Sequence, residues 1–178
     1  LVVGWRVHTS VGEFLLAVAL LVLFAYVMAW IGVLVGLLVP SVEVAQQLGF
    51  LIVFPATFLS NAFVPTETLP RVLQPIAEWN PFSALTSATR DLFGNPNPFG
   101  TAAFPSEHAL LLSLLWTFGL LAVFAPFAVA RYRAIDAAFG DYPHRLHYAL
   151  KANSAFAIAR LLRELGSAVD ANSIWELE

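Results

Sequence analysis

Long apolar runs, separated by polar or proline-rich stretches, dominate the first 130 residues of the sequence. The first run extends from Phe14 to Val39 between Glu13 and Glu43, so that twenty-six consecutive residues carry no charge. As a helix this run is about 39 Å long, more than the ~30 Å of hydrocarbon in a bilayer. We therefore predict a transmembrane helix over residues 14–39.

A second run, about residues 44–63, is also uncharged but carries two glutamines, Pro55, Thr57, Ser60 and Asn61. Because backbone and polar groups in lipid must find partners inside the protein, we expect this span to face other protein on one side. The alternative is a buried helix of a large soluble core.

A third run, residues 109–130, is uncharged and ends at Arg131-Tyr132-Arg133. Arginines that flank a span mark its cytoplasmic side. We therefore predict that the third span runs inward, that the tail after it is cytoplasmic, and that the loop of residues 64–108 lies outside.

The loop of residues 64–108 contains seven of the eleven prolines of the chain. Between the prolines, apolar residues recur at helical spacing on both sides of Asn80-Pro81. This pattern predicts two short amphipathic helices at the outer membrane surface, with Trp79 as an interfacial anchor. An ordinary surface loop is the alternative.

The pattern changes after the third run. Residues 145–151 alternate as in a strand, residues 168–171 read as a second, parallel strand, and Ser173 to Glu176 form a capping box that opens a further helix. Between the strands we predict a helix that is capped by Asn153-Ser154, ends at Gly166 and carries the apolar stripe Ile158, Leu161, Leu162 and Leu165.

Composition supports a division of the chain. Hydrophobic residues make up 59% of it, charged residues 12%, and the mean hydropathy is +0.75, as in a membrane protein. Residues 1–130 carry nine charges and the shorter stretch 131–178 carries twelve. We predict a membrane domain over residues 1–133 and a water-facing domain over residues 134–178.

Charge and residue content exclude several classes of site. A net charge of −3 without a basic stripe argues against nucleic acid as a partner. The chain has no cysteine, hence no disulfide framework and no thiolate metal site. The four histidines lack ligand spacing, so we predict no metal site; they are His8, His108, His144 and His147.

Two stretches of the predicted membrane domain carry distinctive sequence motifs. Residues 54–70 read FPATFLSNAFVPTETLP, and residues 73–94 read LQPIAEWNPFSALTSATRDLFG. They resemble the drug-efflux branch of type 2 ATP-binding cassette exporter permeases, over about residues 1–133. That family places P-x-T-F-x-S-x-x-F-x-P at the outer end of its fifth span, followed by a re-entrant helical hairpin with N-P and an arginine. The matching residues are Pro55, Thr57, Phe58, Ser60, Phe63, Pro65, Asn80, Pro81 and Arg90.

The resemblance implies that the three spans are the last three of six, so that we expect a permease fragment in the plasma membrane. Such permeases export drugs, lipids or polysaccharide-like substrates, dimerise or pair with a second permease, and are driven by a separate cytosolic ATPase subunit. The chain has no GxxxxGK[ST] motif, which fits a permease. The family's coupling helix, which docks the ATPase, is not in this sequence.

Lys151 is the only lysine of the chain and lies in the stretch HYALKANS. A lysine at a strand end is most often a solvated charge. However, residues 139–178 are similar to the start of the pyridoxal-phosphate barrel of diaminopimelate and related amino-acid decarboxylases, whose Y-x-x-K-A-N motif matches Tyr148, Lys151, Ala152 and Asn153. The resemblance implies that Lys151 carries the cofactor.

Only about forty residues of a barrel of roughly 250 are present. We therefore expect no catalytic residue and no functional cofactor, although the segment resembles an enzyme. The predicted fold is mainly α: three transmembrane helices with an outer re-entrant hairpin, then a short βαβ fragment of a (βα)8 barrel. Besides the permease, two alternatives remain: a decarboxylase fragment, and an inactive fusion of two truncated genes. The two parts of such a fusion should make few mutual contacts.

Overall fold

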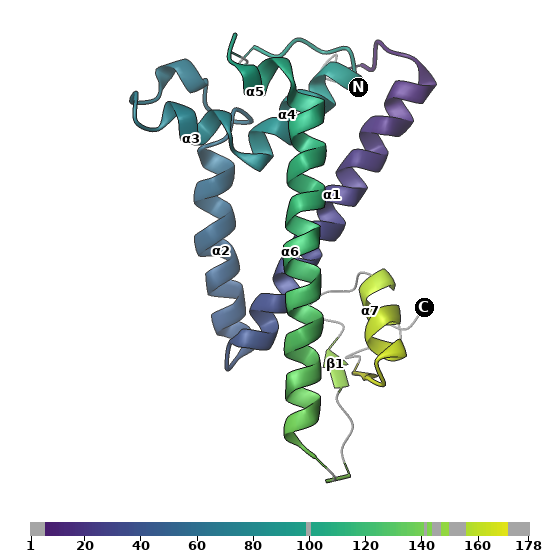
Figure 1. Cartoon of the computed structure of the whole chain (residues 1–178). Coiled ribbons are helices and arrows are strands. Elements are labelled where there is room, and N and C mark those ends of the chain that lie inside the picture. Colours follow the sequence, from purple (N-terminus) through teal and green to yellow (C-terminus); the bar gives the residue numbers. More distant parts are fainter. Residues whose placement is uncertain (1–5, 99–100, 141, 144–146, 150–155, 171–178) are drawn as a thin grey trace. The chain divides into compact units, whose positions relative to one another are not determined.

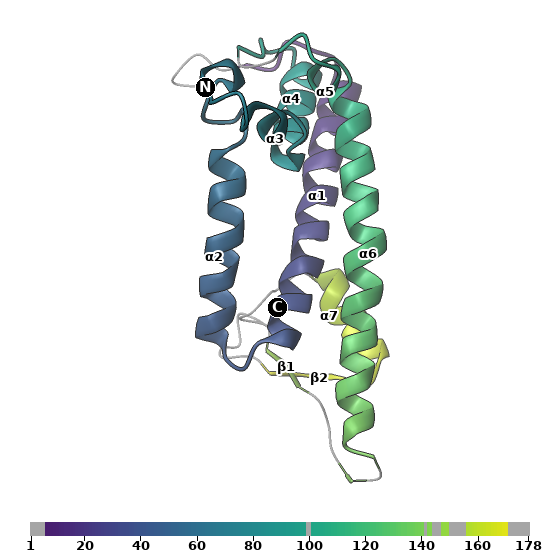
Figure 2. The ribbon, with the colours of Figure 1, turned by 60° about the vertical axis from the view of Figure 1, so that its left-hand side comes forward.

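The computed structural model describes residues 6–98, 101–140, 142–143, 147–149 and 156–170 (Figures 1 and 2). These residues are mainly helical, as the sequence predicts. The elements are α1 (Val11–Leu38), α2 (Val42–Phe58), the 3-10 helix η1 (Thr66–Thr68), α3 (Gln74–Glu78), α4 (Pro81–Leu92), α5 (Phe104–Glu107), α6 (Ala109–Ala138), β1 (His147–Ala149), α7 (Phe156–Glu164) and β2 (Ala168–Asp170).

The chain divides into two compact units. Unit 1 comprises residues 1–25 and 50–120, and unit 2 comprises residues 26–49 and 121–178. Helices α1, α2 and α6 each contribute one part to either unit.

Helices α1 and α6 are the two candidate membrane spans among the described residues. Ser10 and Glu13 form a capping box at the start of α1: Glu13 Oε2 accepts from the Ser10 N–H at 2.9 Å, and Ser10 Oγ accepts from the Glu13 N–H at 3.3 Å. Helix α6 begins at the predicted residue but continues past the arginines to Ala138, since no proline or glycine follows until Gly140. The first and third predicted spans are therefore confirmed as long apolar helices.

The predicted middle span is helical, but the helix ends earlier than the predicted span of residues 44–63. Helix α2 ends at Phe58, and its 17 residues give a length of about 25 Å, which is short of the ~30 Å hydrocarbon layer. The chain leaves the helix where Ser60 donates its hydroxyl to the Thr57 carbonyl and Asn61 turns to other partners. Polar residues at 60 and 61 thus end the helix five residues before the predicted boundary at Phe63.

The predicted hairpin within residues 64–108 is confirmed as α3 and α4, which break at Trp79 and Asn80 (Figure 1). Asn80 caps α4, and Gly94 closes it in the left-handed conformation with φ of 66°. Two short elements were not predicted, η1 and α5. Each has a proline at or just before its first turn.

The core of unit 1 joins α1 to the hairpin and to α6. Leu20, Ala88 and Ala109 form a buried cluster, and Phe24 meets Phe82 edge to face, with ring centroids 5.6 Å apart. The buried residues of α1 in this unit recur at helical spacing, as expected for one packed face; they are Ala17, Leu20 and Phe24.

In unit 2 the tail forms two short strands with a helix between them. Strands β1 and β2 pair in parallel, with His147 opposite Ala168 and Ala149 opposite Asp170 (Figure 2). Helix α7 ends as predicted at Gly166, whose N–H donates to Arg163 O at 3.0 Å. The predicted cap at Asn153-Ser154 and the capping box at residues 173–176 lie outside the described residues.

Candidate functional site

Five polar side chains of unit 1 form one hydrogen-bonded network, which we name the polar clamp: Asn61, Ser83, Ser87, Arg90 and Asn97. The two serines and the arginine lie on one face of α4, at spacings of four and three residues. Asn61 follows α2, and Asn97 follows α4. The polar clamp therefore ties the end of α2 to the helical hairpin.

Asn61 bonds to α4 through both its backbone and its side chain. Its N–H donates to Ser83 Oγ at 3.0 Å, and its Nδ2 donates to Ser87 Oγ at 2.7 Å. Ser87 Oγ also accepts from Asn97 Nδ2 at 2.8 Å. Asn61 and both serines are buried, so water does not replace a bond that is lost.

One buried acceptor of the polar clamp has no partner among the described residues, namely Asn61 Oδ1. An unpaired buried carbonyl oxygen costs free energy. The polar clamp can therefore accept one further hydrogen bond, for which a water molecule is the smallest donor.

Arg90 brings a positive charge to the polar clamp. Its Nη1 donates to the Asn61 carbonyl at 3.3 Å and to Asn97 Oδ1 at 3.1 Å. Desolvation by burial lowers the pKa of Arg90 and raises the pKa of the Asp91 carboxyl. Because the guanidinium of arginine keeps its proton in proteins, Arg90 stays charged at neutral pH.

Asn80 makes a second connection between α2 and the hairpin. Its Nδ2 donates to the Ala56 carbonyl at 2.6 Å, while its Oδ1 accepts from the Phe82 N–H at 2.8 Å. Ala56 lies in the last turn of α2, where carbonyl groups lack intrahelical partners. The Asn80 side chain thus satisfies a carbonyl group at the end of α2 and an N–H group at the start of α4.

Residues 6–9 lie over the opposite end of α4. The His8 N–H donates to the Phe93 carbonyl at 3.0 Å, and Thr9 Oγ1 donates to the Leu92 carbonyl at 2.6 Å. A Cβ added at Gly94 would lie 2.8 Å from Thr9 Cγ2. This close approach requires glycine for its lack of a side chain as well as for its backbone conformation.

The residues that match the sequence motif do not all meet at the polar clamp. Arg90 belongs to it, Asn80 lies beside it, and Ser60 is buried next to Asn61. Phe58 and Phe63 instead belong to an exposed row of aromatic rings along α2 and the turn after it, with neighbouring ring centroids 4.4–5.5 Å apart; the row consists of Phe50, Phe54, Phe58 and Phe63.

Sequence reasoning missed four members of the polar clamp: Asn61, Ser83, Ser87 and Asn97. A signal for two of them was present, because Ser83 and Ser87 share a helical face with Arg90. The apolar positions of α4 were used for the prediction instead. No spacing in the sequence indicates that Asn61 and Asn97 approach that face.

Lys151 and His144 lie outside the described residues. The described part of the chain holds no group of three or more residues suited to a metal ion. The nearest described elements to Lys151 in sequence are β1, which ends at Ala149, and α7, which begins at Phe156.

Comparisons with known proteins match two parts of the chain. Residues 1–93 match the ABC-2 type transporter family, and residues 128–178 match the pyridoxal binding domain of pyridoxal-dependent decarboxylases. The chain is 32% identical to the daunorubicin resistance ABC transporter permease protein DrrB1 of Streptomyces coeruleorubidus, over 133 residues that make up 75% of the chain and 44% of that permease.

The second curated relative is the diaminopimelate decarboxylase of Vibrio cholerae, with 47% identity over 47 residues. That match covers 26% of the chain and 11% of the enzyme. The chain thus spans less than half of the permease and about a tenth of the decarboxylase. No solved structure matches the chain. Both resemblances seen in the sequence are confirmed, and since the family model covers just over half of the residues, the chain belongs to the ABC-2 type transporter family and carries a short decarboxylase-like segment.

Proposed function

We propose that the chain is a permease subunit of an ATP-binding cassette exporter of the drug-efflux type. Membership of the ABC-2 type transporter family is the observation that carries this proposal. That family and the two candidate spans, α1 and α6, indicate a membrane location. The substrate class follows from the similarity to a daunorubicin resistance permease, which also names drug export as the activity to test first.

The polar clamp supports this function because it gives the hairpin α3–α4 a fixed attachment to α2. A short helical hairpin at the end of a span has little apolar area of its own with which to hold its position. The bonds from Asn61 and Asn80 to α4 and α2 supply that attachment. We propose that the hairpin lies at the outer end of the translocation path and moves together with α2.

Orientation and partners belong to the same proposal. Arg131 and Arg133 follow the apolar part of α6, and arginines favour the cytoplasmic side. The residues after α6 are then cytoplasmic, and the polar clamp faces outward. A separate cytosolic ATPase subunit and a second permease copy would complete the exporter, which spans the plasma membrane several times.

Drug retention in cells tests the proposal. The 133 residues of the chain that align with the daunorubicin resistance permease replace their counterpart in that permease, so that the hybrid keeps the rest of the permease. The hybrid is produced with the ATPase subunit of the same exporter in a drug-sensitive bacterium, and daunorubicin inside the cells is measured by its fluorescence. We expect lower accumulation than with the ATPase subunit alone, and a return to that level for Ser87→Ala. Thr86→Ala, on the same helix, should export like the unsubstituted hybrid. Equal accumulation with and without the hybrid would contradict the proposal.

The decarboxylase-like segment gives a second candidate function, favoured by the family match at residues 128–178 and by the parallel pairing of β1 and β2 around α7. We propose that the permease and decarboxylase-like parts meet near residue 133, and that Lys151 is the residue that would carry pyridoxal phosphate, as in the start of a (βα)8 barrel.

The described residues do not fit pyridoxal phosphate. A barrel gathers its cofactor groups from the ends of several strands. Here β1 and β2 have three residues each and are the strands that the described part of the chain offers. We therefore derive no reaction step through the cofactor.

Titration of the full chain with pyridoxal phosphate tests the second function. A working site would give a visible absorbance band that Lys151→Ala removes. We expect the same spectrum from the original chain and from Lys151→Ala. A band seen with the original chain alone would establish a cofactor site.

A further inference from the structure

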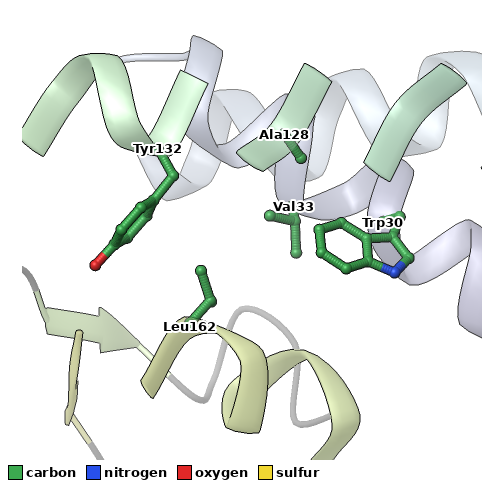
Figure 3. Packing of buried hydrophobic residues seen from close by; sticks show 5 residues of the cluster. All are labelled: Trp30, Val33, Ala128, Tyr132 and Leu162. Atoms are coloured by element: carbon green, nitrogen blue, oxygen red, sulfur yellow. The ribbon is translucent and has the colours of Figure 1, made fainter. Parts of the chain in front are cut away.

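The apolar stripe of α7 packs on side chains of α1 and α6 within unit 2. Leu162 is 3% exposed and belongs to one buried cluster with Trp30, Val33, Ala128 and Tyr132 (Figure 3). We name these four partners the docking cluster. Figure 3 shows Leu162 reaching from α7 into the space between Val33 and Tyr132.

Two further residues of the stripe lie on the same face of α7. Leu161 and Leu165 are partly buried and pack against the docking cluster. The opposite face of α7 is polar: Arg160 and Glu164 pair at 3.3 Å, with side chains that are 72% and 59% exposed. This one-sided pattern shows which face of α7 requires a cover.

The tail cannot supply that cover by itself. Among the described residues it consists of a nine-residue helix and two strands of three residues. These described elements bury little apolar surface among themselves, and an isolated helix of nine residues is unstable in water. The docking cluster supplies the missing apolar surface.

In a complete barrel, the apolar stripe of α7 would pack on strands instead of on α1 and α6. In a (βα)8 barrel the helices form an outer ring and bury their apolar stripes against the strands. Leu162 cannot lie against a completed sheet and in the docking cluster at the same time. Packing on the permease helices and completion of a barrel therefore exclude one another.

We propose that the parts of α1 and α6 that belong to unit 2, residues 26–38 and 121–138, form a docking surface for α7, and that the decarboxylase-like segment serves there as a packed element of the permease instead of as the start of a catalytic domain. A segment joined to the permease by accident should make few contacts with it, whereas Leu162 is as deeply buried as Trp30. The proposal does not depend on export.

Cross-linking tests the docking directly, because the chain has no cysteine of its own. Val33→Cys and Leu162→Cys are combined in the full chain, oxidised with copper phenanthroline in detergent, and analysed for linked peptides by mass spectrometry. The control combines Val33→Cys with Arg160→Cys, on the opposite face of α7. We expect at least about tenfold more linked peptide from the first pair, since a disulfide forms only over a short Cα separation. Equal yields, or no link in either, would overturn the proposal.

A second variant separates docking from barrel packing. Trp30→Ala shrinks the docking cluster but leaves the tail unchanged. If the docking cluster holds α7, hydrogen exchange of the α7 amides should become at least about tenfold faster. Unchanged exchange in Trp30→Ala would show that α7 is held by something else and would contradict the proposal.

Discussion

The polar clamp of unit 1 and the docking cluster of unit 2 hold helices in different ways. The polar clamp uses directed hydrogen bonds between residues distant in sequence, such as Asn61 and Ser87 at 2.7 Å. The docking cluster holds Leu162 by apolar packing. Hydrogen bonds fix one geometry, whereas apolar packing tolerates changes of shape as long as volume is kept.

The solvent explains the difference. Between helices in lipid, apolar contacts gain little, because lipid chains are as apolar as leucine. Hydrogen bonds and close packing then decide which helices associate. Helix α7 has a charged face and lies in a segment of ordinary water-facing composition, so that its apolar stripe is removed from water when Leu162 packs on the docking cluster.

Among the variants that compare the polar clamp with the docking cluster, Leu162→Asp is expected to have the largest effect on local stability. It places a charge in an apolar cluster, and the loss of the leucine alone costs about 2–5 kcal/mol of local stability. Limited proteolysis should therefore cleave after Arg160 and Arg163 much faster than in the original chain. Glu164→Gln, on the exposed face of α7, serves as the control and should be cleaved at the original rate.

Ser87→Ala tests the polar clamp. It removes the acceptor shared by Asn61 and Asn97 and leaves the buried Asn61 amide and the half-buried Asn97 amide without this partner, at a cost of about 2–3 kcal/mol. Thermal unfolding in detergent, followed by tryptophan fluorescence, should show a lower midpoint. Thr86→Ala should shift the midpoint by far less; equal shifts would mean that the hydrogen bonds are not the cause.

Two glycines allow a matched comparison between the units. Gly94 ends α4 with φ of 66°, and Gly166 ends α7 with φ of 91°. A Cβ at Gly94 would approach Thr9 Cγ2 to 2.8 Å, whereas a Cβ at Gly166 meets nothing within 4 Å. Alanine at Gly166 should cost about 1 kcal/mol and alanine at Gly94 about 2 kcal/mol, because only the second adds a steric clash to the backbone strain. Hydrogen exchange of α4 and α7 measures both; equal costs would show that Thr9 moves away freely.

The smallest expected effect concerns pH. Burial raises the pKa of Asp91, so the folded chain binds a proton at this carboxyl more tightly than the unfolded chain does. The stability of unit 1 should therefore fall slightly as pH rises from just below the ordinary value of 3.8 through the raised pKa. Asp91→Asn should remove this part of the pH dependence. If the variant and the original chain keep parallel pH profiles, the carboxyl is not desolvated.

Much of the helical framework could be predicted from the sequence. The long uncharged runs predicted α1 and α6 as apolar helices, and the alternation and stripe of the tail predicted β1, α7 and β2. Gly166 was recognised as the end of α7 because glycine there adopts a left-handed conformation that other residues avoid.

The end of α2 and the polar clamp could not be predicted in the same way. Both depend on Asn61, whose partners on α4 are more than twenty residues away in the sequence. Periodicity reports which face of a helix is apolar, but it does not report which distant loop satisfies the polar face. The docking cluster could not be predicted for the same reason. The apolar stripe of α7 indicates that this face is covered, but not which residues cover it.

We propose that α1 and α6 lie in lipid and anchor the whole chain. Extraction of cell membranes with alkaline carbonate strips proteins that only adhere to the surface, and so distinguishes an anchored chain from an adhering one. The full chain should stay in the sedimented membranes until detergent is added. Release of the chain into the carbonate supernatant as a soluble species would contradict it.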